Sequence, residues 1–343
     1  MKFSRIQDSV SHFWKTSNFR SWRYRARTWL FGRRDQYGVV GKGLLIFLVT
    51  NIAIIYLYPF FQMVTQMLMT IGDIRNPTVN WIPPEPQWEN VAAAIRTLSI
   101  FDFRGTDALL SRGDASLLEF LFEGSLWATL QTSVPPAIAQ VAACSVAGYA
   151  FGRLKFPGRS VLFAMLIITL LVPPQALVMP QYQMYRSFGL LDSPLAFVAP
   201  ALFGHGIRGA LFVIIYSQFF RSLPKELEEA AEIDGATPFR VFWRVMLPLA
   251  KPAMAVVFLF SMVWHWNETY LSGLYFRDLR PLAVRVMEFE LSWAVRDIIP
   301  DNAMVADPVT LAAGVVVVAP LIVMYLFVQR WFTESLERTG IAD

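Results

Sequence analysis

The chain has 343 residues, of which 55% are hydrophobic and 16% are charged, and its mean hydropathy is +0.43. Soluble proteins carry about 25% charged residues, so this composition excludes an ordinary soluble domain and a disordered chain. The single cysteine, Cys144, excludes an internal disulfide and a thiolate metal site, and the three histidines are scattered without a metal-ligand spacing. A polytopic membrane protein remains.

The first 42 residues contain ten lysines and arginines and no long apolar run, which argues against a cleaved signal peptide. Trp14, Trp22 and Trp29 recur at spacings of eight and seven among arginines, as expected for one side of an interfacial helix on anionic lipid. A plain topology signal explains the same charges equally well. The spans that follow disfavour nucleic-acid binding.

A bilayer core of about 30 Å requires roughly 20 apolar residues in a helix. Six segments meet this requirement: Leu44–Met69, Ser125–Phe151, Ser160–Tyr185, Leu195–Phe220, Ala253–Phe276 and Val309–Trp331. Lysines and arginines number 20 in the N-terminal segment, the even loops and the tail, against 9 in the odd loops. The positive-inside rule therefore places both termini in the cytoplasm and predicts an all-α integral membrane protein with six transmembrane helices.

The chain divides at the ends of these spans. The expected divisions are a basic cytoplasmic segment (1–43), a first transmembrane helix (44–70), a long extracytoplasmic loop (71–124), a five-helix core (125–333) and a cytoplasmic tail (334–343). The long outer loop is rich in proline near its start, and short helices are expected at Glu89–Leu98 and Leu117–Glu123.

The fourth loop, residues 221–252, has the pattern of two helices joined by a turn. Pro224 suits a first helical turn, and acids such as Glu226 and Glu228 favour a helix N-terminus. Gly235 suits the left-handed residue that closes this helix. Thr237 followed by proline predicts the start of the second helix.

The second helix of this loop is expected to end at Leu247-Pro248. Phe239, Phe242 and Met246 follow helical spacing and predict an apolar stripe on a segment that the charge count places in water. Small residues at Ala230 and Ala231 allow another protein to approach closely. An exposed hairpin of this kind predicts a partner groove.

The same loop carries a family pattern: Glu229-Ala230-Ala231, Gly235 after three more residues, and Val245-x-Leu247-Pro248 after a further nine. It resembles the EAA loop of permease subunits of ATP-binding-cassette (ABC) importers, with Val245 in place of the usual isoleucine. Further segments are similar to the carbohydrate-type permeases, in particular the second permease of maltose-type systems: Gly148–Gly158, Ser187–Asp192 and Trp264–Glu268. The resemblance covers Ser125–Trp331 and implies a type I importer permease fold with cytoplasmic coupling helices.

The resemblance also implies what the chain works with. It assigns contact with the ATPase to Glu229, Ala230, Ala231, Asp234, Gly235, Leu247 and Pro248. No Walker A pattern is present, so we expect that this chain is not an enzyme and binds no cofactor. ATP and magnesium are expected on a separate ATPase. The implied partners are two ATPase subunits, a second homologous permease and an extracytoplasmic solute-binding protein, at the cytoplasmic membrane of a bacterium or archaeon.

Polar and proline residues interrupt several spans. Pro135-Pro136 and Pro173-Pro174 are expected to be flexing points or static kinks. Arg208 and Glu268 are charges inside spans, which mark pathways, and their expected depths differ by about 12 Å. We interpret Arg208, and Glu268 with its neighbour Asn267, as possible pathway residues, with packing or gating favoured over solute contact for the last two.

The solute expected from the resemblance is a sugar, oligosaccharide or polyol, and an ABC permease for a non-carbohydrate solute is the nearest alternative. A secondary transporter would require two inverted halves with ion-coupling carboxylates, for which only Glu268 qualifies. An integral-membrane enzyme would require a cluster of acids or histidines at one membrane depth, and the sequence has none.

Overall fold

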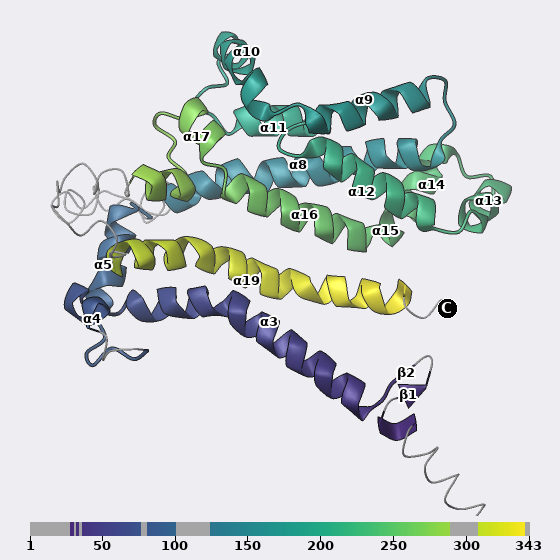
Figure 1. Ribbon diagram of the computed structural model, residues 1–343. Coiled ribbons are helices and arrows are strands. Elements are labelled where there is room, and N and C mark those ends of the chain that lie inside the picture. Colours follow the sequence, from purple (N-terminus) through teal and green to yellow (C-terminus); the bar gives the residue numbers. More distant parts are fainter. Residues whose placement is uncertain are drawn as a thin grey trace, which may run out of the picture. The chain divides into compact units, whose positions relative to one another are not determined.

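The structure is a computed structural model (Figure 1). It describes residues 28–30, 32–33, 36–76, 81–100, 124–288 and 308–339. The chain divides into two compact units, residues 1–65 and 66–343. The predicted positions of Trp14 and Trp22 and the predicted short helix at Leu117–Glu123 lie outside the described residues.

The first unit consists of a short antiparallel pair and a long apolar helix. Strands β1 (Gly32–Arg33) and β2 (Gln36–Tyr37) are each two residues long, a small departure from the all-α prediction. Helix α3 (Val39–Gln66) follows, starting five residues before the expected Leu44. Its 28 residues extend about 42 Å, and none is buried within this chain, as suits a helix in contact with lipid.

The second unit is built around one long helix, α8. Its principal helices are α8 (Ser125–Arg153), α11 (Leu195–Leu202), α12 (Gly209–Ser222), α16 (Lys251–Trp266) and α19 (Pro308–Thr339). Helices α11, α12 and α16 all pack on α8, and α19 packs on α16 (Figure 1). Helix α8 runs unbroken through Pro135-Pro136, so these prolines mark no break.

Close packing of α8 against α12 depends on small residues. A Cβ atom at Gly148 would lie 2.3 Å from the Tyr216 Cβ, and one at Gly152 would lie 3.0 Å from the Ser217 carbonyl oxygen. At Gly148 only glycine permits this approach without a shift of one helix, and at Gly152 any larger residue would be tightly packed. Behind the two glycines, Tyr216 and Phe220 stack in a buried aromatic cluster.

Three of the six expected spans are not single helices. The third is α9 (Arg159–Leu171) followed by α10 (Pro174–Ser187), which meet at an angle of 98°. The fourth is interrupted between α11 and α12, and the fifth divides into α16 and α17 (Tyr270–Tyr275). Proline accounts for the first interruption, because Pro173 disfavours helix at Val172 and starts a new one at Pro174.

The six predicted spans are not confirmed as six spanning helices in the described part of the chain. Helices α3, α8 and residues 308–329 of α19 are long and apolar enough to cross a bilayer. The count reaches five if the bent pair α9–α10 and the bent pair Pro238–Leu249 with α16 are each one span. The helices α11 and α12 have 8 and 14 residues and are too short alone.

The described residues between α3 and α8 form two short helices. Helix α4 (Ile71–Arg75) begins with a capping box between Thr70 and Asp73, whose hydrogen bonds hold the pKa of the Asp73 carboxyl below its ordinary value. Helix α5 (Trp88–Thr97) confirms the helix predicted at Glu89–Leu98. It packs on α19, and the Asn90 amide donates to the carbonyl oxygens of residues 67 and 69.

Candidate functional site

The loop between α12 and α16 is a helical hairpin, and its first half matches the sequence prediction. Helix α13 (Glu226–Ile233) has three acids in its first turn. Gly235 then adopts φ +77°, and its N–H donates to the Glu232 carbonyl oxygen at 2.9 Å. The predicted left-handed closing residue is confirmed, because φ near this value favours glycine.

The second half of the hairpin is longer than predicted. The Thr237 hydroxyl accepts from the Arg240 N–H, and the chain continues through α14 (Pro238–Val241), a π-helical turn η1 (Phe242–Met246) and α15 (Leu247–Leu249). Leu247-Pro248 therefore does not end the helix, because a proline is tolerated in the first turn of α15. The break comes at Ala250, where the axis turns by 73° into α16.

The second half of the hairpin buries most of the predicted apolar stripe. The predicted apolar stripe of Phe239, Phe242 and Met246 is wrong, because Phe242 is 5% exposed and Met246 is fully buried. Phe242 packs on Tyr149 of α8, with ring centroids 5.0 Å apart. On the outer side Phe239 instead meets Trp243, four residues further along the helix.

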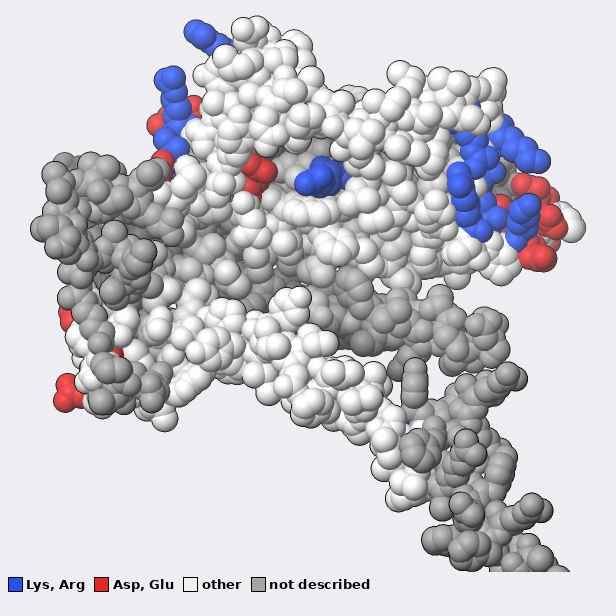
Figure 2. All heavy atoms as spheres, in the orientation of Figure 1, with Lys and Arg blue, Asp and Glu red and all other residues white. Residues whose placement is uncertain are grey.

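The outer surface of the hairpin combines acids with large apolar side chains. Ile233 is 87% exposed, Phe239 74% and Trp243 49%. Of the residues assigned to ATPase contact, the exposed ones are Glu229, Ala230, Asp234, Gly235 and Pro248, and the half-buried ones are Ala231 and Leu247. Figure 2 shows acidic and basic groups gathered at the end of the unit where Figure 1 places α13.

An arginine that sequence reasoning missed fastens this hairpin to α8. Arg153, the last residue of α8, donates to the carbonyl oxygens of Leu223 (2.6 Å) and Pro224 (3.2 Å). Its Nε lies 3.6 Å from the Glu228 carboxylate, and the two side chains are 6% and 17% exposed. The sequence offered one signal for this contact: Arg153 lies within the stretch Gly148–Gly158 that resembles the family. A buried arginine requires a paired acceptor.

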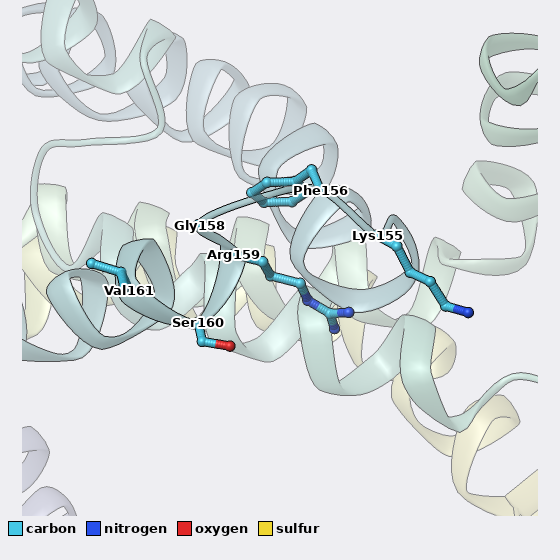
Figure 3. A pocket seen from close by; sticks show the side chains of 6 residues that line it. All are labelled: Lys155, Phe156, Gly158, Arg159, Ser160 and Val161. Atoms are coloured by element: carbon cyan, nitrogen blue, oxygen red, sulfur yellow. The ribbon is translucent and has the colours of Figure 1, made fainter.

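A shallow depression of about 420 Å³ lies at the turn between α8 and α9 (Figure 3). It is lined by Lys155, Phe156, Gly158, Arg159, Ser160 and Val161. The Arg159 guanidinium already donates to the Phe151 carbonyl oxygen at 2.6 Å. None of the residues that line this depression contacts the hairpin through a hydrogen bond or ion pair found among the described residues. In the part of the chain described here no group of three acids, histidines or cysteines could hold a metal ion.

The interruption between α11 and α12 is held by buried polar groups. Gly204, Gly206 and Arg208 all have positive φ. The Gln140 side chain of α8 donates to the carbonyl oxygens of His205 and Ile207, at 3.0 Å each, and accepts from the Ser261 hydroxyl of α16. Irregular backbone at membrane depth requires such partners, because no water replaces the lost helical hydrogen bonds.

The three expected pathway residues lie on two elements and do not pair. Arg208 is exposed, with its guanidinium carbon 5.8 Å from the centre of a Trp264 ring. Glu268 accepts the Leu271 N–H at 2.8 Å, and Asn267 donates to the backbone of its own helix. None of the ion pairs among the described residues joins Arg208 to Glu268.

A bundle of apolar helices with interrupted spans and an anchored hairpin defines a multi-pass membrane permease. Residues 143–338 match the family of binding-protein-dependent transport system inner membrane components, and the chain belongs to this family. The members are permease subunits of ABC importers and are not enzymes, because ATP is hydrolysed on a separate subunit. The chain is thus a multi-pass inner-membrane protein that works in a complex with partner subunits.

Similar proteins agree with this assignment. The sn-glycerol-3-phosphate transport system permease protein UgpE of Brucella abortus is 25% identical over 90% of this chain and 98% of its own length. The maltose/maltodextrin transport system permease protein MalG of Escherichia coli K12 is 30% identical over 63% of this chain and 71% of its own length. A bacterial ABC transporter involved in alginate import shares the fold, with a TM-score of 0.59 at 21% identity over 87% and 99% of the two chains. The resemblance to maltose-type permeases is confirmed.

Proposed function

We propose that this chain is the permease through which an ABC importer moves a sugar, oligosaccharide or polyol into the cytoplasm. The named solutes of its relatives support this class, since UgpE belongs to an sn-glycerol-3-phosphate system and MalG to a maltose/maltodextrin system. The match to UgpE extends over nearly the whole of that relative, so it includes both the hairpin and the interrupted spans.

The observation that carries the coupling role is the anchored hairpin with an exposed, mixed surface. Glu229 and Ala230 are exposed, which supports these roles: Glu229 pairs with a basic group of the ATPase, and the small Ala230 allows close approach. Gly235 sets the angle between α13 and the second half of the hairpin. Apolar anchors such as Ile233 and Phe239 fit a groove, which is how a helical segment binds a larger partner.

The remaining assignments follow from this role. Two ATPases carrying ATP and magnesium bind the hairpins, a second homologous permease completes the pathway, and a solute-binding protein delivers the solute outside. Both termini lie in the cytoplasm, with six membrane crossings: α3, α8, α9–α10, α11–α12, α16–α17 and α19. In this arrangement Arg208, Asn267 and Glu268 lie along the pathway.

Photo-crosslinking from the hairpin tests the coupling role. Cys144 is buried and is the only cysteine in the sequence, so a cysteine introduced at Ile233 can be labelled with benzophenone maleimide. We expect an adduct with the ATPase in native membranes. Phe188→Cys, 68% exposed at the end of α10, is the matched control and should give none. Equal adducts from both positions would contradict the assignment.

Uptake by vesicles containing the whole transporter and its binding protein tests the solute class. Radiolabelled maltose and sn-glycerol 3-phosphate are the first probes, and amino acid and oligopeptide mixtures are the comparison. ATP-dependent uptake confined to the amino acids or peptides would show that the solute is not a carbohydrate or polyol.

A further inference from the structure

The depression between α8 and α9 lies where the chain turns at a membrane boundary. Helix α8 is long and apolar enough to cross a bilayer and ends at Arg153, and α9 begins at Arg159. The short connection between them cannot extend far from the end of the apolar core. In the orientation proposed above, this turn faces the cytoplasm, and the cytoplasmic leaflet carries the anionic lipids.

Basic side chains from two parts of the chain meet at this depression. Lys155, Arg159 and Ser160 line it, and Figure 3 shows their side chains extending to the same side of the turn. Arg221, near the end of α12, joins them through a shared acceptor. The Phe151 carbonyl oxygen accepts from Arg159 at 2.6 Å and from Arg221 at 3.1 Å, so the two guanidinium groups are close neighbours.

No carboxylate neutralises this basic cluster among the described residues. Their ion pairs occupy the carboxylates of Glu228 and Glu288, and none of these pairs includes Lys155, Arg159 or Arg221. The turn itself contains no acid. Two like charges held against one oxygen repel each other, and a bound anion would offset this repulsion.

The two arginines are fixed in place and still have donors to offer. The Arg221 guanidinium carbon lies 5.5 Å from the centre of the Phe163 ring of α9. Both arginines use one terminal nitrogen, Nη2, for the backbone contacts, whereas a guanidinium carries five N–H donors. Lys155 is exposed and adds a further charge. The cluster therefore presents positioned donors to an anion of phosphate geometry.

The depression continues into an apolar surface along α9. Val161 lines the depression and begins a stripe that includes Met165 and Ile168, at helical spacings of four and three. These side chains are 64%, 56% and 56% exposed, and none of the residues of α9 is buried within this chain. A charged end followed by an apolar run of this kind matches the polarity of a phospholipid.

We infer that Lys155, Arg159 and Arg221 bind the phosphate headgroup of an anionic phospholipid from the cytoplasmic leaflet, whose acyl chain lies along α9. Basic pockets at this end of membrane helices bind such headgroups. Because α9 packs on α12, a headgroup held between the two arginines would fasten the bent third span to the core. The inference goes beyond the proposed function and rests on it only for the side of the membrane. The rival occupant is an acidic segment of a partner subunit.

Lipid titration of the whole transporter tests this site. The complex is delipidated in mild detergent and titrated with phosphatidylglycerol or phosphatidylcholine, and bound lipid is counted by native mass spectrometry. We expect the wild type to bind phosphatidylglycerol at least tenfold more tightly, because a basic residue near the surface contributes about 1 kcal/mol toward an anionic lipid and the cluster has several. Inorganic phosphate at millimolar concentration should not displace the lipid, since it lacks an acyl chain.

Substitution of Lys155 assigns the preference to this cluster without removing a backbone hydrogen bond. Lys155→Gln should weaken phosphatidylglycerol binding about fivefold, the factor that corresponds to about 1 kcal/mol, and should leave phosphatidylcholine binding unchanged. Lys251→Gln removes the same charge from an exposed lysine at the start of α16 and should bind both lipids as the wild type does.

The side of the membrane is checked separately. Cys144 is buried and is the only cysteine in the sequence, so Lys155→Cys can be labelled with a membrane-impermeant maleimide. We expect labelling only after the cells are opened. Labelling in intact cells would place the turn outside and overturn the assignment to the cytoplasmic leaflet.

Three further results would overturn the inference. The first is equal phosphatidylglycerol binding by Lys155→Gln and the wild type. The second is displacement of the lipid by inorganic phosphate, which would indicate a site for the free ion. The third is loss of a partner subunit from Lys155→Gln but not from Lys251→Gln on size exclusion. The Ile233 crosslink to the ATPase does not depend on added lipid, so failure of the lipid site is distinguishable from failure of the coupling role.

Discussion

The Arg153 guanidinium, at the end of α8, lies 3.6 Å from the Glu228 carboxylate of α13, in a contact that is nearly closed to solvent. The same side chain binds two carbonyl oxygens of the segment that enters the hairpin. The hairpin is thus attached to the helix on which α11, α12 and α16 all pack. The buried side chains of Phe242 and Met246 add apolar contacts between the hairpin and the same core cluster.

Removal of the Arg153 side chain should uncouple the hairpin. Arg153→Ala leaves two carbonyl oxygens without their donor and Glu228 without its counter-ion, and hydrogen bonds to charged groups contribute about 1.5–3 kcal/mol each. We expect ATP hydrolysis to continue in the assembled transporter while solute uptake falls by tenfold or more, a factor worth about 1.4 kcal/mol. Uptake and hydrolysis measured on the same proteoliposomes give the ratio directly.

A double-mutant cycle separates the ion pair from the backbone hydrogen bonds. Glu228→Gln should lower the ratio of uptake to hydrolysis less than Arg153→Ala does. The double variant should lose less, in free-energy terms, than the sum of the two single losses, because the two residues share one contact. Arg240→Ala, an exposed arginine on the second half of the hairpin, is the matched control and should preserve coupling. Additive effects of Arg153 and Glu228 would refute a direct link.

The turn at Gly235 offers a second test of coupling. Gly235→Pro should uncouple hydrolysis from uptake, because proline requires φ near −65° and the native value is +77°. A Cβ atom at this position meets nothing within 4 Å, so the defect is one of backbone conformation and not of crowding. Gly235→Ala should destabilise the turn by about 1–2 kcal/mol, the cost of left-handed φ for a residue with a Cβ atom. Gly235→Asn should destabilise it less, since asparagine tolerates left-handed φ.

Crosslinking of Ile233→Cys to the ATPase in the Gly235 series gives an independent measure of hairpin geometry. The adduct yield should decrease in the order glycine, asparagine, alanine, proline. Normal uptake and an unchanged adduct in Gly235→Pro would contradict the coupling role of this turn.

Sequence reasoning located the continuous elements well, because they depend on local pattern. Helices α8 and α19, the helix α5 and the left-handed turn at Gly235 all follow from apolar length, capping and glycine placement. The hairpin residues Glu229–Ala231 were identified from the resemblance of their pattern to the EAA loop of ABC importer permeases. These features require no knowledge of what lies beside them.

The interruptions and the buried polar contacts could not be predicted in the same way. An apolar run reads as one span whether or not it breaks, and the break at 203–208 is stable only because Gln140 of another helix supplies hydrogen bonds. The burial of Phe242 likewise involves a residue distant in sequence, Tyr149 of α8. Arg153 lies 75 residues before Glu228, and no local pattern joins them.

Loss of the Gln140 amide should destabilise the interrupted span. Gln140→Leu has similar volume but leaves two part-buried carbonyl oxygens without their donor, and a lost hydrogen bond of this kind costs about 1 kcal/mol of stability. We expect a lower midpoint of thermal unfolding in detergent and reduced uptake. Gln218→Leu, an exposed glutamine of α12, is the control for the same change of chemistry and should leave both values near those of the wild type. A Gln140→Leu protein as stable as Gln218→Leu would mean that the break needs no partner.

Replacing glycine by alanine should change the free energy of unfolding in opposite directions inside and outside the contact between α8 and α12. Gly148→Ala forces a Cβ atom to within 2.3 Å of Tyr216, so one helix must shift, and overpacking typically costs about 1–3 kcal/mol. Gly273→Ala in α17 meets nothing within 4 Å and should be neutral or stabilising by up to about 1 kcal/mol, because alanine favours helix. The midpoints of thermal unfolding of the two variants, measured in the same detergent, test this difference. Equal destabilisation at both positions would show that helix propensity, and not the close approach of α8 to α12, sets the requirement for glycine.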